Sequence, residues 1–128
     1  MDNAKLDSIS KTILNSSIEV HRNLGPGLLE SVYEICLYKE LTNSGLFVER
    51  QVYLPVLYKD EVMQIDFRID LLVEKNIIIE LKAVESLLPV HEAQILTYLR
   101  LADKKLGFLI NFNVPKLIEG FKRKVNNF

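Results

Sequence analysis

The sequence has a single cysteine and no excess of either charge. Cys36 alone can form neither an internal disulfide nor a Cys-rich zinc site, which fits a reducing compartment. Sixteen Lys and Arg residues face seventeen Asp and Glu residues, for a net charge of −1. This balance argues against a protein that coats DNA non-specifically, and leaves only a local basic patch as a route to nucleic acid.

Long apolar segments are also missing. No stretch approaches the roughly eighteen uninterrupted apolar residues of a membrane span, and no basic segment followed by an apolar run opens the chain. We therefore expect a cytoplasmic protein that is neither secreted nor membrane-spanning. The chain has no repeats, low-complexity segments or linker, and 48% of its 128 residues are hydrophobic. This size suits one core, so we expect residues 1–128 to form a single domain.

Hydrophobic periodicity predicts the order of the elements. Helical spacing indicates a helix over about residues 5–24, a Gly-Pro-Gly break, and a second helix that ends near Asn43. Extended patterns follow, with a bend or bulge at Pro55, and predict a three-stranded antiparallel meander over 47–82 with a turn at Lys75-Asn76. A helix over 90–103, a buried strand over 107–112 and a basic tail that could form an edge strand complete the chain.

Charged side chains interrupt the last two strands of the meander. Side chains two residues apart share a strand face, so two sets of charges are expected to lie together: Asp66, Arg68 and Asp70 on one strand, Glu80 and Lys82 on the next. If the strands pair, acidic groups from both meet at one end of the sheet. Such a cluster is costly without a compensating cation, so it is either a metal site or a salt-bridged sheet face.

Polar residues on the helices add candidates. Glu30 is expected on or beside the buried stripe of the second helix, where a carboxylate needs a partner, whereas Glu34 is expected to face water. The alternative role for Glu30 is a hydrogen bond to Tyr33 or to a backbone amide at the edge of the core. Gln94 and Tyr98 lie one turn apart on the helix over 90–103.

The element order is similar to the αβββαβ core of the PD-(D/E)XK nuclease superfamily, with one extra N-terminal helix. The signature of that superfamily is an acidic residue on one strand and Glu-x-Lys on the next, which Asp70 and Glu80-Leu81-Lys82 match. Ile69 stands where the name of the superfamily has proline. The resemblance implies a restriction-endonuclease-like α/β fold, in which helices flank a mixed sheet.

Residues 27–33, Gly-Leu-Leu-Glu-Ser-Val-Tyr, resemble the defining motif of the GxxExxY protein family, a branch placed in that superfamily. Residues 20–27 and 107–112 resemble the same family, and the likeness extends from about residue 9 to residue 125. Gln94-x-x-x-Tyr98 resembles a motif of exonuclease-like and CRISPR-associated members.

The resemblance implies a centre for Mg²⁺ or Mn²⁺, hard ions that bind carboxylate, carbonyl and water oxygens. Asp70 and Glu80 would supply two ligands and the backbone carbonyl of Leu81 a third, while Glu30 could reach in from its helix. Lys82, on the same face as Glu80, could orient a water or stabilise charge developing on a phosphate.

The other candidates would contact substrate or support the ligands. Gln94 and Tyr98 would brace the ligands or touch the DNA backbone. Arg68 could contact phosphate, although a salt pair with Asp66 is favoured. The expected function is a divalent-metal-dependent phosphodiesterase that acts on DNA, with RNA as the less favoured substrate. The alternative is a binding or accessory protein that keeps the fold without cutting. Small nucleases of this fold often pair, which predicts a homodimer.

Overall fold

The structure is a computed structural model that describes residues 1–128. It contains three α-helices, five strands and one 3₁₀-helix, in the order α1 (Asn3–Leu24), α2 (Glu30–Asn43), β1 (Val48–Tyr58), β2 (Glu61–Val73), β3 (Ile77–Lys82), α3 (Pro89–Ala102), β4 (Leu106–Asn111), η1 (Leu117–Gly120) and β5 (Phe121–Val125). The predicted order of helices and strands is confirmed, and the basic tail forms a strand. None of the helices is both long and apolar enough to cross a membrane.

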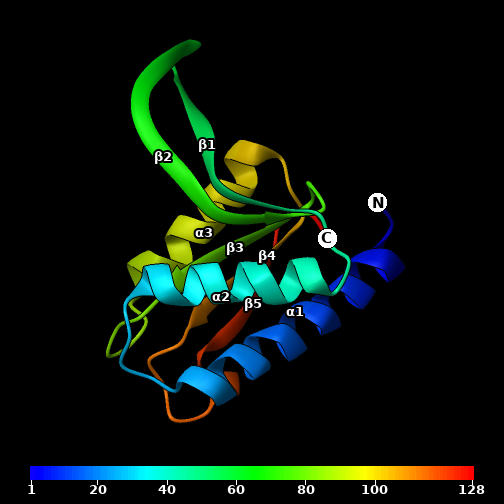
Figure 1. Ribbon diagram of the computed structural model, residues 1–128. Helices are drawn as coiled ribbons and strands as arrows, with labels where there is room; N and C mark the ends of the chain where they lie inside the picture. Colours follow the sequence, from blue (N-terminus) through cyan, green and yellow to red (C-terminus); the bar gives the residue numbers. More distant parts are fainter.

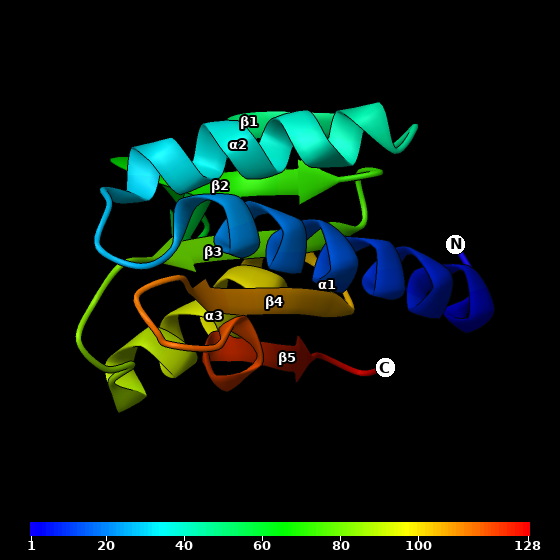
Figure 2. The ribbon, with the colours of Figure 1, turned by 60° about the horizontal axis from the view of Figure 1, so that its bottom comes forward.

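The strands form one sheet in the order β1-β2-β3-β4-β5. Only β3 and β4 run parallel, because α3 carries the chain back across the sheet between them. In Figure 2, α1 and α2 lie in front of the sheet and α3 behind it. The predicted mixed sheet flanked by helices is therefore confirmed.

The alternation of side chains along β3 explains why both faces of the sheet are covered. Ile77, Ile79 and Leu81 pack into the cluster that contains the apolar stripes of α1 and α2. Ile78 points the other way, into the cluster formed with α3. A strand that is buried on both faces reads as a continuous apolar run, as β3 does apart from Glu80 and Lys82.

The β1–β2 hairpin extends beyond the rest of the sheet (Figure 1). The pairing of β2 with β3 covers only residues 71–73, so residues 52–69 pair with each other alone. We call this segment the arm. A two-residue turn at Lys59 and Asp60, both with positive φ, reverses the chain at its tip. The pairing register shifts at Pro55, which confirms the predicted irregularity there.

Candidate active site at the fork between two strands

Two acidic residues stand where β2 and β3 separate. The β2–β3 ladder ends at the pair Leu71 and Ile79, and the next residues along the two strands are Asp70 and Glu80. The backbone N–H of Asp70 donates to Glu80 Oε1 at 3.3 Å, and the N–H of Leu81 donates to Asp70 Oδ2 at 2.8 Å. The two carboxylates thus accept hydrogen bonds from backbone N–H groups that no longer have a partner in a neighbouring strand. We call this point the fork.

Burial makes the fork an unfavourable place for two negative charges. Only 6% of Glu80 is exposed, and burial, followed by the charge of Asp70, raises its pKa well above the ordinary value. The pKa of Asp70 is also raised, mainly by burial, although the hydrogen bond from the Leu81 N–H opposes this. A positive charge placed at the fork would therefore stabilise the ionised forms of both carboxyls.

Groups from three further positions surround the pair. The charge of Lys82 lowers the pKa of both carboxyls, and the charge of Glu30, at the first residue of α2, raises that of Asp70. Burial raises the pKa of the Tyr98 hydroxyl, and the charges of Glu80 and Asp70 raise it further. Residues from α2, β2, β3 and α3 thus act on one another electrostatically at the fork.

Three other sequence candidates, Arg68, Gln94 and Glu30, make no hydrogen bond to either carboxylate. Arg68 lies on the arm and forms an exposed ion pair with Asp66 at 2.8 Å, as the sequence favoured. Gln94 is half-buried one turn before Tyr98, and its side chain makes no hydrogen bond within the chain. Glu30 is exposed, and no group of three His, Cys, Asp or Glu side chains is close enough to hold an ion.

The loop before α2 is held by Tyr33. Its hydroxyl donates to the Gly25 carbonyl at 2.7 Å and accepts from the Leu28 N–H at 3.1 Å. Its buried ring stacks on Phe112 with centroids 4.6 Å apart. The hydrogen bond considered between Tyr33 and Glu30 is absent. Tyr33 instead fixes the loop from which α2 starts, and so fixes where Glu30 stands.

The expected roles of Glu30 and Glu34 in α2 are reversed, because Glu34 is buried and Glu30 is exposed. Arg50 donates to Glu34 Oε2 through Nε and Nη2, both at 3.2 Å. Gln51 donates to Glu34 Oε1 at 2.7 Å and to Asp70 Oδ1 at 3.4 Å. Spacing could not separate the glutamates, since each lies three or seven residues from apolar positions of the stripe. Glu34 is buried because Arg50 and Gln51 of β1 bind it, and no local sequence pattern predicts these contacts.

The donor set at the fork fits a hard divalent cation. It offers carboxylate oxygens from Asp70 and Glu80, with the single positive charge of Lys82 nearby, whereas a borderline-soft ion such as zinc would favour sulfur or nitrogen ligands. A bound cation would relieve the electrostatic cost that raises the pKa of both carboxyls.

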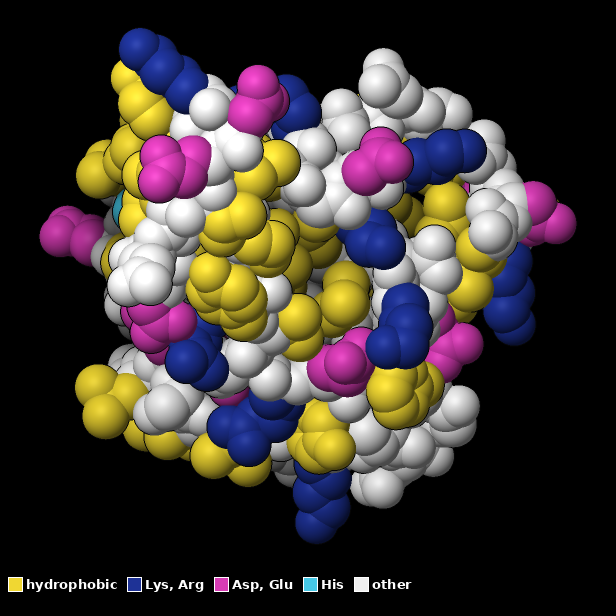
Figure 3. Space-filling view, turned by 90° about the horizontal axis from the view of Figure 1, so that it is seen from above, with side chains coloured by type: hydrophobic (Ala, Val, Ile, Leu, Met, Phe, Trp, Pro, Cys, Tyr) yellow, Lys and Arg dark blue, Asp and Glu magenta, His cyan; other side chains and the backbone are white.

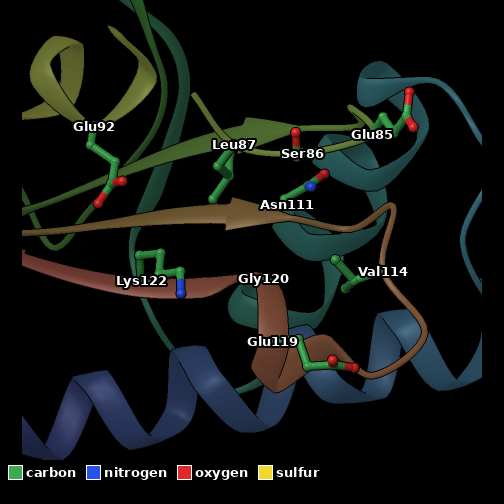
Figure 4. Close-up of a pocket in the computed structure, with 9 residues that line it drawn as sticks. All are labelled: Glu85, Ser86, Leu87, Glu92, Asn111, Val114, Glu119, Gly120 and Lys122. Atoms are coloured by element: carbon green, nitrogen blue, oxygen red, sulfur yellow. The ribbon is translucent and has the colours of Figure 1, made fainter. Parts of the chain in front are cut away.

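A pocket of about 340 Å³ lies near the end of the β3–β4 ladder (Figure 4). Its lining includes Glu92 and Lys122 and reaches Asn111, which pairs with Lys82 across the two strands. None of the sequence-predicted site residues lines this pocket. The buried amide of Asn111 accepts from the N–H groups of Val84 and Asn113 and donates to the Val84 carbonyl. The pocket wall is therefore a structural tie between the strand ends.

Comparison with known proteins identifies the family of the chain. A family model described as the PD-(D/E)XK nuclease superfamily matches residues 7–124, from α1 into β5, and so includes both sides of the fork. No curated protein and no solved structure matches the chain. Nucleases of this superfamily generally use divalent metal ions. Since the match spans nearly the whole chain, the protein belongs to the PD-(D/E)XK nuclease superfamily.

Proposed function

We propose that the protein is a divalent-metal-dependent nuclease that hydrolyses phosphodiester bonds in DNA, and that it belongs to the GxxExxY branch of its superfamily. The observation that carries the proposal is the fork, where a buried Glu80 and a half-buried Asp70, both with raised pKa, lie close to Lys82. A salt-bridged sheet face would instead have each carboxylate paired, and neither Asp70 nor Glu80 forms an ion pair.

In this proposal Asp70, Glu80 and the carbonyl of Leu81 hold Mg²⁺ or Mn²⁺. Glu30 supplies a further acidic ligand, since its side chain is exposed and free to rotate toward the fork. The ion, when bound, polarises the scissile phosphodiester and lowers the pKa of a coordinated water. Lys82 orients the attacking water or stabilises the negative charge that develops on the phosphate.

Tyr98 and Gln94 have supporting roles in the proposal. The Tyr98 hydroxyl, held close to both carboxyls by α3, braces them on the side opposite α2. Gln94, with its amide free of partners, is available to the DNA backbone. Arg68 contacts phosphate only by leaving Asp66, so its contribution is minor.

Cleavage assays test the enzymatic part. Supercoiled, linear and branched DNA, and an RNA of matched sequence, are incubated with the protein in Mg²⁺ or Mn²⁺. We expect nicking that is lost in Lys82→Ala and retained in Lys59→Ala, a control at the exposed tip of the arm. Equal activity in wild type and Lys82→Ala would mean that a contaminant cuts.

Calorimetric titration with Mn²⁺ tests the metal site separately. Binding to wild type should disappear in the double variant Asp70→Asn, Glu80→Gln. The control is Asp66→Asn, Glu61→Gln, which removes the same charge from the exposed arm. Absence of heat at millimolar Mn²⁺ would reject the site.

The alternative is a protein that binds nucleic acid or a protein partner without cutting. It is favoured by one observation, since only two carboxylates meet at the fork and no third His, Cys, Asp or Glu side chain joins them. Metal binding and DNA binding without nicking would identify this alternative.

We also propose that two copies pair through the arm. Its outer side exposes large apolar side chains, among them Tyr53, Leu57 and Val62, and Leu57 and Val62 are cross-strand partners. Figure 3 looks down on the side from which the arm projects and shows hydrophobic side chains gathered around a hollow. The arm has two cations against three acidic residues, so it suits a protein surface better than phosphate.

Sedimentation analysis tests the pairing. Wild type should sediment as a dimer and Leu57→Asp as a monomer, with Lys59→Asp as the control for added charge at the tip. A monomeric wild type at high micromolar concentration would reject a dimer.

A further inference from the structure

Gln51 has a backbone conformation that is unusual within a strand. Its φ is 52°, in the left-handed region that glycine occupies readily and other residues rarely. The β1–β2 pairing runs from Arg50 with Leu71 to Val52 with Ile69, so Gln51 and Asp70 occupy the skipped step. The irregularity in β1 therefore lies directly opposite the candidate metal ligand.

At this step the alternation of side chains between the two faces of the sheet is shifted by one residue in both strands. Val48 packs with α1 and α2, whereas Val52 and Leu54 pack on the α3 side, although strand alternation would place all three on one face. In β2, Leu71 and Ile69 likewise belong to opposite clusters. This change of phase brings the Gln51 amide to Asp70 Oδ1, and it is also where the arm begins.

The Gln51 amide is fixed from the other side by a buried residue. Glu34 is only 7% exposed, and its carboxylate accepts from Gln51 Nε2 at 2.7 Å. Arg50 holds the other oxygen of Glu34. A chain of hydrogen bonds thus runs from α2 through β1 to the fork, and the same Gln51 nitrogen reaches both carboxylates.

We propose that Gln51 is a positioning residue, whose amide, anchored by Glu34, orients the Asp70 carboxylate for metal binding. The inference rests on the proposed metal site at the fork. Two observations distinguish this role from a packing role. The Gln51 side chain is exposed and belongs to neither apolar cluster, and the backbone at this position would suit glycine better. Compared with glycine, glutamine adds only its side chain here, and the contacts of that side chain are the hydrogen bonds of its amide.

Substitution by glycine isolates the amide, because glycine keeps the left-handed backbone and removes only the side chain. The matched control is Gln64→Gly, at an exposed glutamine on the same hairpin whose side chain makes no hydrogen bond. We expect Gln51→Gly to bind Mn²⁺ about tenfold more weakly in calorimetry, as for other groups that orient metal ligands. Gln64→Gly should bind like wild type.

Thermal unfolding without metal shows whether the loss is local. Gln51→Gly should unfold close to the wild-type temperature, since relief of the left-handed backbone strain opposes the loss of the hydrogen bond to Glu34. Wild-type Mn²⁺ affinity in Gln51→Gly would overturn the inference while leaving the metal site intact. A weaker affinity in a variant that is partly unfolded at the temperature of the titration would also overturn it, because the effect would then be one of folding.

A second readout does not depend on metal. The ¹⁵N-labelled side-chain amide of Gln51 should shift in Asp70→Asn and in Glu34→Gln, while that of Gln64 on the arm stays in place. If wild type fails to bind Mn²⁺, the proposed function falls, and this readout still decides the inference. An unmoved Gln51 amide in Asp70→Asn would overturn it.

Discussion

Glu80 is a residue whose ionisation opposes folding. Its pKa is raised well above the ordinary value, so the unfolded chain releases this proton at lower pH than the folded protein does. At pH values below the ordinary pKa of a glutamate, Glu80 is protonated in both the folded and the unfolded state, so its ionisation costs no stability. This penalty grows as pH rises toward the folded-state pKa and is complete above it.

We predict that Glu80→Gln stabilises the metal-free protein at neutral pH, by on the order of 1 kcal/mol for each unit by which burial raises the pKa. The amide oxygen still accepts from the Asp70 N–H, and the Asp70 carboxylate is the neighbouring acceptor for the new side-chain NH2. Thermal unfolding in a chelator from pH 4 to pH 8 measures the effect. The stabilisation by Glu80→Gln should vanish toward pH 4.

Glu61→Gln, at the exposed tip of the arm, is the control and should leave the unfolding temperature unchanged. A loss of stability in Glu80→Gln at neutral pH would contradict the prediction. In the wild type, Mn²⁺ should remove the penalty by neutralising the pair, so metal should stabilise wild type more than Glu80→Gln.

At the scale of elements, α3 packs closely against β4 at Gly107. A Cβ added at Gly107 would lie 3.1 Å from the Ile78 carbonyl oxygen, 3.1 Å from Ile95 Cδ1 and 3.2 Å from Leu99 Cδ2. We predict that Gly107→Ala destabilises the protein by about 1–3 kcal/mol, because α3 must move away from the sheet. Chemical denaturation measures the change.

A double-mutant cycle supplies the control. Ile95→Val removes the Cδ1 atom that the new methyl group would meet, so Gly107→Ala should be less damaging in that background. Equal losses in both backgrounds would show that contact with α3 is not the cause. Since α3 also carries Tyr98, Gly107→Ala should weaken Mn²⁺ binding as well.

The basic residues of β5 are engaged by acidic neighbours. Lys124 hydrogen-bonds to Glu92 of α3 and thereby lowers the pKa of that carboxyl, and the charge of Lys122 lowers it further. Arg123 lies 3.7 Å from Asp7. We therefore predict that Lys122→Ala, Lys124→Ala leaves the salt dependence of DNA binding unchanged in a mobility-shift assay.

A phosphate contact at this strand would give the opposite result. Each lysine bound to phosphate contributes roughly one to the slope of log affinity against log salt. A shallower slope in the double variant would show that β5 touches DNA. Lys82→Ala, which removes a cation at the fork, is the comparison expected to lower the slope.

Elements and site differ in how far the sequence could predict them. Helices and strands follow local periodicity, which explains why α3 and the β3 run were predicted. Asp70, Glu80 and Lys82 could be named because their signature depends only on alternation along two neighbouring strands. Gln51 and Glu34 could not, since their contacts require a left-handed residue in β1 and a change of faces, neither of which leaves a local pattern.

The alternation rule also failed at one point for a physical reason. It placed Asp70 on one face with Asp66 and Arg68, but β2 changes faces between Ile69 and Leu71. The ion pair of Arg68 with Asp66 therefore belongs to the arm, separate from the fork.

For the whole molecule, we propose that residues 1–128 fold as one domain. The two apolar clusters lie on opposite faces of the same strands, and neighbouring residues Ile78 and Ile79 of β3 belong to different clusters. Disruption of either cluster exposes strands that the other needs. We therefore predict a single transition in calorimetry, with equal calorimetric and van't Hoff enthalpies. Two resolved transitions would show that the faces unfold separately.

The position of β5 gives its charges another consequence. It is the last strand of the sheet, so one side of its backbone has no neighbouring strand. An open strand edge is a template on which further chains can add and grow into aggregates, and lysine and arginine side chains discourage such growth. Lys122, Arg123 and Lys124 follow one another along this edge. We therefore expect the three basic residues of this edge to discourage aggregation of the concentrated protein.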